Sequence, residues 1–543
     1  MNAVTTHASI PAASPTWKNW SENVVHDGNN YYFKPTTKAE LQSVLAQARE
    51  KGATVRVSGQ RHSQPPLVAT DNRGVTPPPE ANAYLVDMSY YVDLGTTGME
   101  LGPGPNQVQV NPGIREDNLD AFLSANKLML KTVTAGGFFS IGGMTAVDVN
   151  GATVAQPIFS ETVSSFTIMG PDGNETVIDA ELELNFARVS LGALGIVIRM
   201  TIDVAPRPQP TTIQGGIDNY MLKDEHEFTD KLEELLTGPN KHDRMEIFYT
   251  PYAAAWAFLG VTNILVLWWD EVAAAEPPSA PPPPPDYETA CELSDKNPPE
   301  YGAPLLSGLA SFGEPVIREL QYQNPLFPLL PPPVAPIPAI AMSEIESQVK
   351  EANEVYSDLW LTEASRVVFM SYFVELPGLD KAGLSRLWQC LEVAADYATS
   401  DDSGFHFAGP MEFRFMKGGT AAMSGTYTTN PDAYFVNLDL LAFTEPTSGK
   451  DYPDALLKAF AHVERTRVKL GGLPHNGKMY GFYDPNDSNP DSYTPPFNED
   501  FVNFVRGERN KRGAPVDAFV DFAKSRDPNG MFNNPYVRNL LGI

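Results

Sequence analysis

The hydrophobic and polar positions in the first third of the chain alternate between helical and strand spacing. Over residues 36–51 apolar side chains recur every three or four positions. This apolar face consists of Leu41, Val44, Leu45 and Ala48. Thr37 is placed as a helix cap with Glu40 three residues later, and Gly52 follows the last turn. We therefore expect a helix here, followed by a strand over residues 54–57.

Similar spacing predicts the elements further along the chain. Short apolar runs over residues 83–88 and 107–110 favour strands, and residues 119–127 have helical spacing. The segment Ala205-Pro206-Arg207-Pro208 then interrupts the pattern after Val204. The later elements that we expect are strands over residues 245–249 and 260–269, a helix over 516–524 and a turn over 527–530.

Two stretches, residues 276–286 and 325–342, are dense in proline. Proline blocks the interior of helices and sheets, so both are predicted to be loops or polyproline segments. The first has polar flanks and is expected to lie on the surface. The second is too apolar for a solvated linker, and its pattern leaves open whether it packs against a core or lines an apolar pocket. Its apolar residues are Leu326, Phe327, Leu329, Leu330, Val334, Ile337 and Ile340.

Composition narrows the class of protein. The 543 residues carry a net charge of −28, which argues against nucleic acid and against docking on anionic membranes. Cys291 and Cys390 form no metal-ligand spacing; one disulfide between them is possible, so the redox compartment stays open. No apolar run is long enough to span a bilayer, and residues 1–17 lack a signal-peptide pattern. We expect a soluble monomer without a metal, cytoplasmic unless an export signal has been removed.

The segment from Val57 to Ser63 carries the first candidate chemistry. It reads Val57, Ser58, Gly59, Gln60, Arg61, His62 and Ser63, and it follows a predicted strand. Such a turn directs backbone N–H groups at an anion and places an imidazole beside it. If the anion belongs to a dinucleotide, His62 is a candidate for a covalent bond to the cofactor, although a loop imidazole can also serve only the backbone.

Three glycine elements follow in order. They are Ser140-Ile141-Gly142-Gly143, Asn150-Gly151, and Gly192 with Gly195 before Val197. Glycine allows close approach of the backbone to a ligand, but each element alone is also typical of a turn between strands. In this order after His62, they resemble the FAD-binding domain of the vanillyl-alcohol-oxidase (PCMH-type) flavoprotein superfamily.

That resemblance implies a cofactor and its contacts. It implies FAD held by the His62 turn and the glycine elements, with Asn534 near the C-terminus, and an 8α-histidyl bond through His62. Many relatives have histidine where this chain has Asn150. The resemblance also implies an α+β fold: an FAD-binding domain over residues 1–210, a substrate-binding cap domain with an antiparallel sheet and flanking helices over 211–490, and a segment, 491–543, that returns to the first domain.

Motifs in the second half narrow the resemblance. Glu412 and Arg414 have strand spacing, so both side chains project from one face and can pair. Lys478 lies in the turn Pro474-His475-Asn476-Gly477-Lys478. These motifs are similar to those of aldonolactone and alditol oxidases, and over nearly the whole chain the sequence resembles bacterial cholesterol oxidases of the covalent-flavin type (type II). Carried over to this chain, their catalytic set is Glu246, Glu412, Arg414, Asn437 and Lys478, with Glu246 and Asn437 resting on looser local similarity.

The resemblance implies oxidation of a sterol hydroxyl to a ketone, with O2 as acceptor, release of H2O2 and isomerisation of the double bond. Burial raises the pKa of a carboxyl and an adjacent arginine lowers it. Glu412 beside Arg414 is therefore expected to stay ionised, which suits a gate or an electrostatic role, and the resemblance implies that this pair gates a tunnel for oxygen. Glu246, if buried without a cation, is the expected base. Contact with a membrane would be transient. The alternatives are a polyol or aldonolactone oxidase and a non-catalytic lipid-binding relative.

Overall fold

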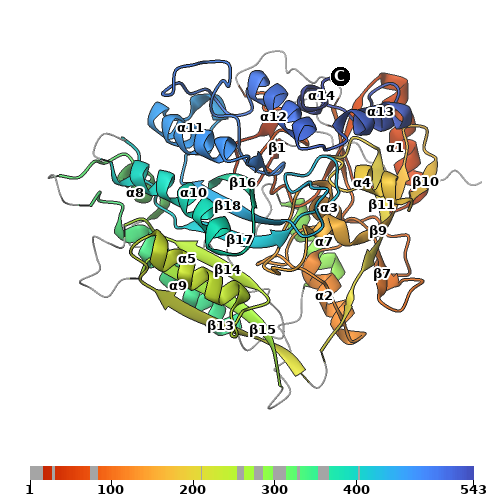
Figure 1. Ribbon diagram of the computed structural model, residues 1–543. Coiled ribbons are helices and arrows are strands. Elements are labelled where there is room, and N and C mark those ends of the chain that lie inside the picture. The colour runs from red at the N-terminus through yellow and green to blue at the C-terminus, as the bar shows by residue number, and fades with distance from the viewer. Residues whose placement is uncertain are drawn as a thin grey trace, which may run out of the picture.

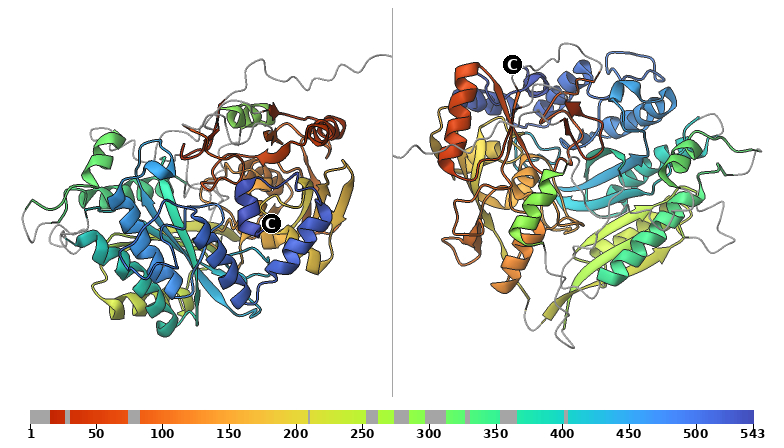
Figure 2. Two further views of the ribbon diagram at one scale, coloured as in Figure 1. Left: turned by 90° about the horizontal axis from the view of Figure 1, so that it is seen from above. Right: turned by 180° about the vertical axis from the view of Figure 1, so that it is seen from behind.

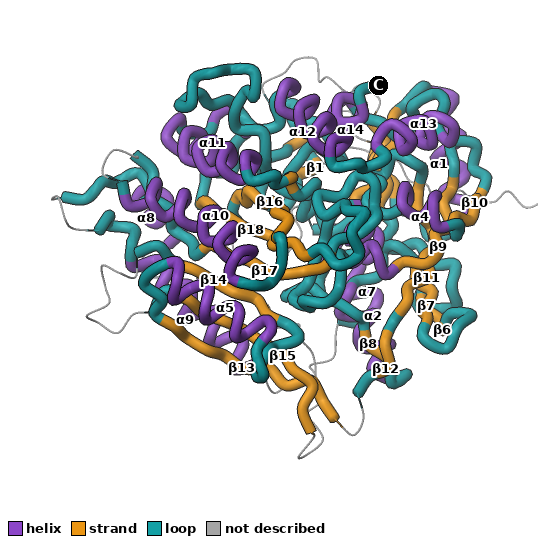
Figure 3. Tube along the Cα trace, in the orientation of Figure 1, coloured by secondary structure: helices purple, strands orange, loops and turns teal. Residues whose placement is uncertain are grey.

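The computed structural model describes residues 16–26, 31–73, 83–208, 211–252, 262–273, 285–296, 313–326, 331–352, 366–400 and 404–543. Three sheets with flanking helices make up most of the molecule (Figure 1; Figure 3). This arrangement confirms the α+β class.

The first sheet is parallel and contains three strands in the order β3-β5-β4. Its strands are β3 (Tyr31–Phe33), β5 (Ala83–Asp87) and β4 (Thr54–Ser58), and α1 (Lys38–Lys51) connects β3 to β4. The hydroxyl of Thr37 accepts the Glu40 N–H, and Gly52 ends α1 with a φ of 62°. Both caps were predicted, and both are confirmed. A hairpin of β1 (Trp17–Lys18) and β2 (Val25–His26) precedes this sheet.

The second sheet is antiparallel, with the order β10-β9-β11-β7-β6. The strands are β10 (Glu175–Ile178), β9 (Val163–Met169), β11 (Ile196–Asp203), β7 (Gln107–Val110) and β6 (Met99–Leu101); the helices near it are α2 (Glu116–Ala125), α3 (Ile141–Ala146) and α4 (Glu181–Ala187). Helix α2 begins three residues earlier than predicted, because Glu116 and Asp117 suit the first turn of a helix. The proline-marked break at Ala205 is a short strand, β12 (Ala205–Pro206), which pairs with β8 (Leu128–Met129).

The third sheet contains seven antiparallel strands in the order β13-β15-β14-β17-β18-β16-β19. They are β13 (Thr211–Tyr220), β15 (Ile264–Ala273), β14 (Met245–Tyr249), β17 (Met411–Lys417), β18 (Tyr434–Ala442), β16 (Val368–Leu376) and β19 (Leu473–Pro474). Helices α5 (Glu225–Thr237), α10 (Lys381–Thr399) and α11 (Asp454–Lys469) cover one face, and α9 (Pro336–Ala352) lies against β13 and β15 on the other (Figure 2). The expected antiparallel sheet with flanking helices is therefore confirmed.

The apolar proline-rich stretch is helical over part of its length. Helix α9 starts at Pro336, so the predicted loop is wrong for residues 336–342, because proline is tolerated in the first turn of a helix. Val334 and Ile337 are buried in the core, whereas Leu326 is 82% exposed. Phe327, Leu329 and Leu330 lie outside the described residues, as do residues 276–284 of the first proline-dense stretch.

The C-terminal segment packs back against the first sheet. Its helices are α12 (Glu499–Lys511), α13 (Val516–Arg526) and α14 (Pro535–Leu541). Elsewhere in the chain, helices α7 (Tyr287–Asp295) and α8 (Gly313–Leu320) precede α9. The predicted turn at 527–530 is confirmed: the Asp527 carboxylate accepts the N–H groups of Met531 and Phe532. The Val55 N–H then donates to the carbonyl of Met531 at 2.8 Å, which joins the end of the chain to β4.

The two cysteines, Cys291 and Cys390, are buried and form no disulfide, so the possible bridge between them does not form. Among the described residues, no helix has the length and apolar character needed to cross a membrane.

Candidate functional site

A cavity of about 370 Å³ lies between the first two sheets and the seven-stranded sheet. One wall is the turn over residues 57–63, with Ser140, Gly142 and Gly143 beside it. The opposite wall consists of side chains from β14, β17 and β18, and residues of α9 complete it. The cavity therefore brings together segments from both halves of the chain.

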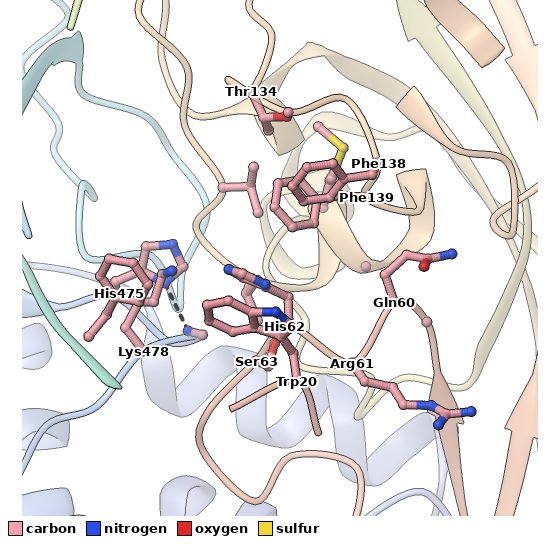
Figure 4. Close-up of a pocket in the computed structure, with 18 of the residues that line it drawn as sticks. Trp20, Gln60, Arg61, His62, Ser63, Thr134, Phe138, Phe139, His475 and Lys478 are labelled. Atoms are coloured by element: carbon pink, nitrogen blue, oxygen red, sulfur yellow. Dashed lines mark hydrogen bonds between the residues drawn. The ribbon is translucent and has the colours of Figure 1, made fainter. Parts of the chain in front are cut away.

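The His62 turn is shaped by close packing of the backbone. An added Cβ at Gly59 would lie 2.5 Å from the Ser140 hydroxyl oxygen, so a larger residue would separate the two segments. Arg61 has a φ of 56°, in the left-handed region, and its carbonyl accepts the Trp20 N–H at 2.8 Å. The Arg61 guanidinium turns away from His62 (Figure 4). It donates to the Tyr32 hydroxyl.

Aromatic rings enclose the His62 imidazole. It stacks on Trp20 with ring centroids 4.4 Å apart, and the edge of Phe139 approaches it at 4.9 Å (Figure 4). Burial holds the pKa of His62 well below its usual range, and the positive charge of Lys478 and then His475 lowers it further. The imidazole is therefore neutral at pH 7, which leaves a ring nitrogen with the lone pair that a covalent bond needs.

The glycine elements supply bare backbone to the cavity. Gly142 packs on Pro112, where an added Cβ would lie 2.6 Å from the proline ring, and Gly192 has a φ of 70°. The side-chain nitrogen of Asn150 is buried at the cavity and donates no hydrogen bond within the described part of the chain. A glycine-lined wall with an unused amide donor fits a dinucleotide such as FAD, with its polar phosphates and ring edges.

Most of the predicted cofactor contacts line the cavity. They are Val57, Ser58, Gly59, Gln60, Arg61, His62, Ser63, Ser140, Gly142, Gly143, Asn150 and Gly192. The other predicted contacts, Ile141, Gly151, Gly195, Val197 and Asn534, do not border it. Gly151 instead packs on the backbone of Val133, and Asn534 donates to the carbonyl of Pro66 and caps α14.

Strand alternation builds the opposite wall. On β17, Phe413 points toward the helical layer, where its ring lies 6.2 Å from that of Phe228 in α5. Glu412 and Arg414 therefore point to the other face, into the cavity. Across the register, Arg414 lies opposite Asn437 of β18. All five predicted catalytic residues, Glu246, Glu412, Arg414, Asn437 and Lys478, line this one cavity.

One guanidinium holds two carboxylates at this wall. The Nη2 atom of Arg414 lies 2.6 Å from an oxygen of Glu246 and 2.6 Å from an oxygen of Glu412. Glu246 is 2% exposed but does have a cation, so the premise that favoured it as the base is wrong. Burial raises the pKa of Glu412 to about 8; Arg414 opposes the rise, and Glu246 and Asp439 add to it. The pKa of Glu412 is therefore shifted upward and not downward, because desolvation and like charges outweigh the single guanidinium.

Two further side chains complete the polar wall. The Asn437 amide donates to the Ser371 hydroxyl at 2.7 Å, which fixes its orientation. Lys478 extends over the ring of Phe369, with its nitrogen 4.1 Å from the ring centroid. Burial lowers the pKa of Lys478, and the negative charges of Asp439 and Glu412 oppose that lowering. Lys478 is therefore a partly buried cation at the cavity, and not a solvated surface lysine.

The sequence reading missed several residues of the cavity. Asp439 lies two positions after Asn437, so strand alternation could have placed it on the same face. His475 belongs to the same turn as Lys478; its Nδ1 accepts the Gly477 N–H at 2.8 Å, and burial lowers its pKa to about 4. No sequence signal marked Trp20 or Phe139, because an aromatic residue in a loop belongs to no periodic pattern that would predict which way its side chain points.

The raised pKa of Glu412 has a consequence for stability. A carboxyl whose pKa is higher in the folded chain stabilises the fold below its ordinary value of 4.5, and that contribution is lost as pH rises through about 8. Glu412→Gln cannot ionise at this position. As pH rises from 5 to 9, we therefore expect the unsubstituted protein to lose free energy of unfolding relative to Glu412→Gln. Urea unfolding across this pH range measures the effect, and a constant difference between the two proteins would contradict it.

Comparison with known proteins agrees with this geometry. Residues 30–179 match the family model of an FAD binding domain. The chain is 28% identical over 240 residues to the L-gulono-1,4-lactone dehydrogenase of Mycobacterium tuberculosis, covering 44% of this chain and 50% of that protein. It is 28% identical over 202 residues to the D-arabinono-1,4-lactone oxidase of Eremothecium gossypii, covering 37% and 36%. The matches thus span at most half the length of these relatives.

Similar solved structures cover nearly the whole chain. A cholesterol oxidase from B. sterolicum has a TM-score of 0.69 at 15% identity, covering 97% of this chain and 96% of that one. A solvent-stable cholesterol oxidase has a TM-score of 0.71 at 17% identity, covering 100% of both chains. At this identity the similarity establishes the fold.

Proposed function

We propose that this chain, whose residues 30–179 match an FAD binding domain and whose fold is that of two cholesterol oxidases, oxidises a secondary alcohol on a bulky apolar substrate such as a sterol. The product is a ketone, with O2 as electron acceptor and H2O2 released. Bound FAD would supply the redox chemistry, taking a hydride from the carbinol carbon and passing its electrons to O2.

One observation carries the choice of substrate: apolar side chains border the polar wall of the cavity. Ala341 and Ile345 come from α9, and Phe248 and Leu441 come from the sheet. A dry apolar surface suits a steroid skeleton, while the charged cluster next to it suits a single hydroxyl. The substrate's ring system would pack on α9 and present its alcohol to the wall of Glu412 and Arg414.

The chain's own residues would then orient the reacting atoms. The His62 turn and the glycine wall would hold the FAD, with the neutral His62 ring placed for a covalent bond. Asn437 lines the cavity with its amide nitrogen bound to Ser371, so its carbonyl oxygen would be the group left to accept a hydrogen bond from the substrate. Arg414 and Lys478 supply positive charge, which would stabilise negative charge on a reduced cofactor. The Glu412–Arg414 pair is also the candidate gate for oxygen.

The relatives support a second candidate function. They are named for aldonolactone substrates, and the charged wall would also hold a polyol or lactone. Peroxide release with cholesterol, xylitol and a galactonolactone, measured side by side, separates the candidates. Turnover of cholesterol alone supports the sterol proposal, and turnover confined to the polar substrates supports the second. In cholesterol reactions, absorbance of the conjugated enone reports isomerisation.

We expect His62 to carry the FAD covalently. The purified protein should be yellow, and its band on a denaturing gel should fluoresce under ultraviolet light. His62→Ala should lose the fluorescent band completely while still binding FAD through the rest of the cavity wall. His242→Ala is the matched control, because His242 pairs with Asp270 outside the cavity. A non-fluorescent band from yellow unsubstituted protein would rule out the covalent bond.

A further inference from the structure

Asp439 is a third carboxylate at the cavity. It lies on β18, two residues after Asn437 and directly opposite Glu412 in the register with β17. Its side chain lines the same cavity as the two glutamates. Three acidic side chains therefore face one substrate site from three neighbouring positions.

Asp439 differs from the two glutamates in its hydrogen bonding. Glu246 and Glu412 each have an oxygen 2.6 Å from Arg414. The Oδ1 atom of Asp439, in contrast, is buried and accepts no hydrogen bond from the residues that the structure describes. A buried carboxylate oxygen without a donor costs free energy, and a hydroxyl group arriving in the cavity would remove that cost.

The charges that face Asp439 favour a role in proton transfer. Glu412 and Arg414 face it from β17, Glu246 lies beyond them on β14, and Lys478 and His475 face it from the turn after β19. Arg467 of α11 lies behind the sheet within electrostatic range. The neighbouring glutamates share one guanidinium, whereas in the part of the chain that the structure describes neither Arg414 nor Lys478 makes a salt bridge with Asp439.

We propose that Asp439 accepts the hydroxyl proton of the substrate alcohol, an assignment that rests on the proposed function. The O–H bond breaks and its proton passes to the Asp439 carboxylate. Bound FAD would take the carbinol hydrogen with its electron pair as hydride, so that the carbon–oxygen bond becomes the ketone carbonyl. This proton and hydride are the two hydrogens that O2 finally receives as H2O2. Glu246 and Glu412 keep Arg414 in place.

The test is anaerobic reduction of the bound FAD by the alcohol that turns over best, followed by stopped-flow absorbance. We expect Asp439→Asn to slow reduction by about 10²-fold or more, the usual effect of losing a general base. The matched control is Asp432→Asn, on the exposed turn before β18, which should reduce at the unsubstituted rate. The acid limb of the rate against pH should disappear in Asp439→Asn. Asp439→Glu, which keeps the carboxylate, should retain that limb at a lower rate.

A binding measurement gives a second readout that does not depend on turnover. A tertiary-alcohol analogue of the substrate can donate its hydroxyl but has no carbinol hydrogen to lose. Calorimetry should show about tenfold weaker binding of this analogue to Asp439→Asn and unchanged binding of the ketone product, roughly one hydrogen bond's worth of free energy. Flavin absorbance and thermal unfolding report whether each variant folds and binds FAD.

The outcomes separate the inference from the proposed function. If Asp439→Asn is reduced as fast as Asp432→Asn, the assignment of the proton to Asp439 is overturned while the alcohol oxidase remains. If the unsubstituted protein is reduced by none of the alcohols, the proposed function falls and the assignment falls with it. If Asp439→Asn fails to bind FAD, Asp439→Glu is the test. A retained acid limb in its dependence of reduction rate on pH supports the assignment to Asp439, and a lost acid limb overturns it.

Discussion

Arg414→Met is expected to slow flavin reduction by about 10³-fold, the effect of removing a charged group aimed at the reacting atoms. Arg414 is the shared partner of Glu246 and Glu412, with both oxygens 2.6 Å from its Nη2 atom. Without it, two buried carboxylates face each other and at least one must take a proton. Anaerobic stopped-flow reduction measures the rate, and the loss should persist at saturating substrate.

A structural loss must be separated from a chemical one, because breaking a buried ion pair costs about 3–5 kcal/mol. The chain offers a matched control in Arg188, whose Nη1 atom lies 3.1 Å from Glu161, with the side chains 8% and 7% exposed. Arg188→Met should lose comparable stability in urea unfolding but keep its rate of reduction. If both variants are slowed equally, Arg414 acts through the fold and not through the site.

Local spacing predicted those parts of the site that are set by neighbouring residues. Alternation on β17 placed Glu412 and Arg414 on one face, and the structure has them there. The cap at Thr37 and the turn at Asp527 depend on contacts within a few residues, and both are confirmed. These features need only the local conformation of the chain.

Features that depend on distant strands could not be read in this way. Glu246 reaches Arg414 because β14 lies beside β17 in the seven-stranded sheet, although 168 positions separate the two residues. Without that strand order, the sequence could make Glu246 the base only on the condition that it is buried without a cation, and the structure does not meet that condition. Asp439 shows the same limit: alternation gives its face, but nothing local shows that its oxygen has no donor.

Composition misled the prediction for α9. Proline was taken to exclude a helix, but Pro336 stands in the first turn, where its missing N–H has no partner to lose. The two roles left open for this stretch both occur, since Ile337 packs in the core and Ala341 borders the cavity. One helix therefore supplies both the packing and part of the apolar wall.

The second large effect is expected at Asp148, a fully buried carboxylate that joins three segments behind the cavity. It accepts the Gly425 N–H at 2.9 Å and both the backbone and side-chain N–H groups of Asn476, at 2.8 and 2.6 Å. Asn476 in turn accepts from the Arg509 guanidinium of α12 at 2.8 Å. The turn that carries His475 and Lys478 is held by this network.

Asp148→Ala should therefore lower the free energy of unfolding by about 4 kcal/mol or more, because three buried donors lose a charged acceptor and Arg509 loses its nearby negative charge. Asp148→Asn keeps the shape but directs an NH2 group at other donors, so an intermediate loss is expected.

Asp172→Ala is the control: Asp172 lies in an exposed turn and accepts the Asn174 N–H, and its loss should cost about 1 kcal/mol or less. Urea unfolding of the three variants measures the order. Since the His475–Lys478 turn would move as well, Asp148→Ala should also lose FAD more readily than Asp172→Ala. Equal stability of these two variants would show that the network does not hold the turn.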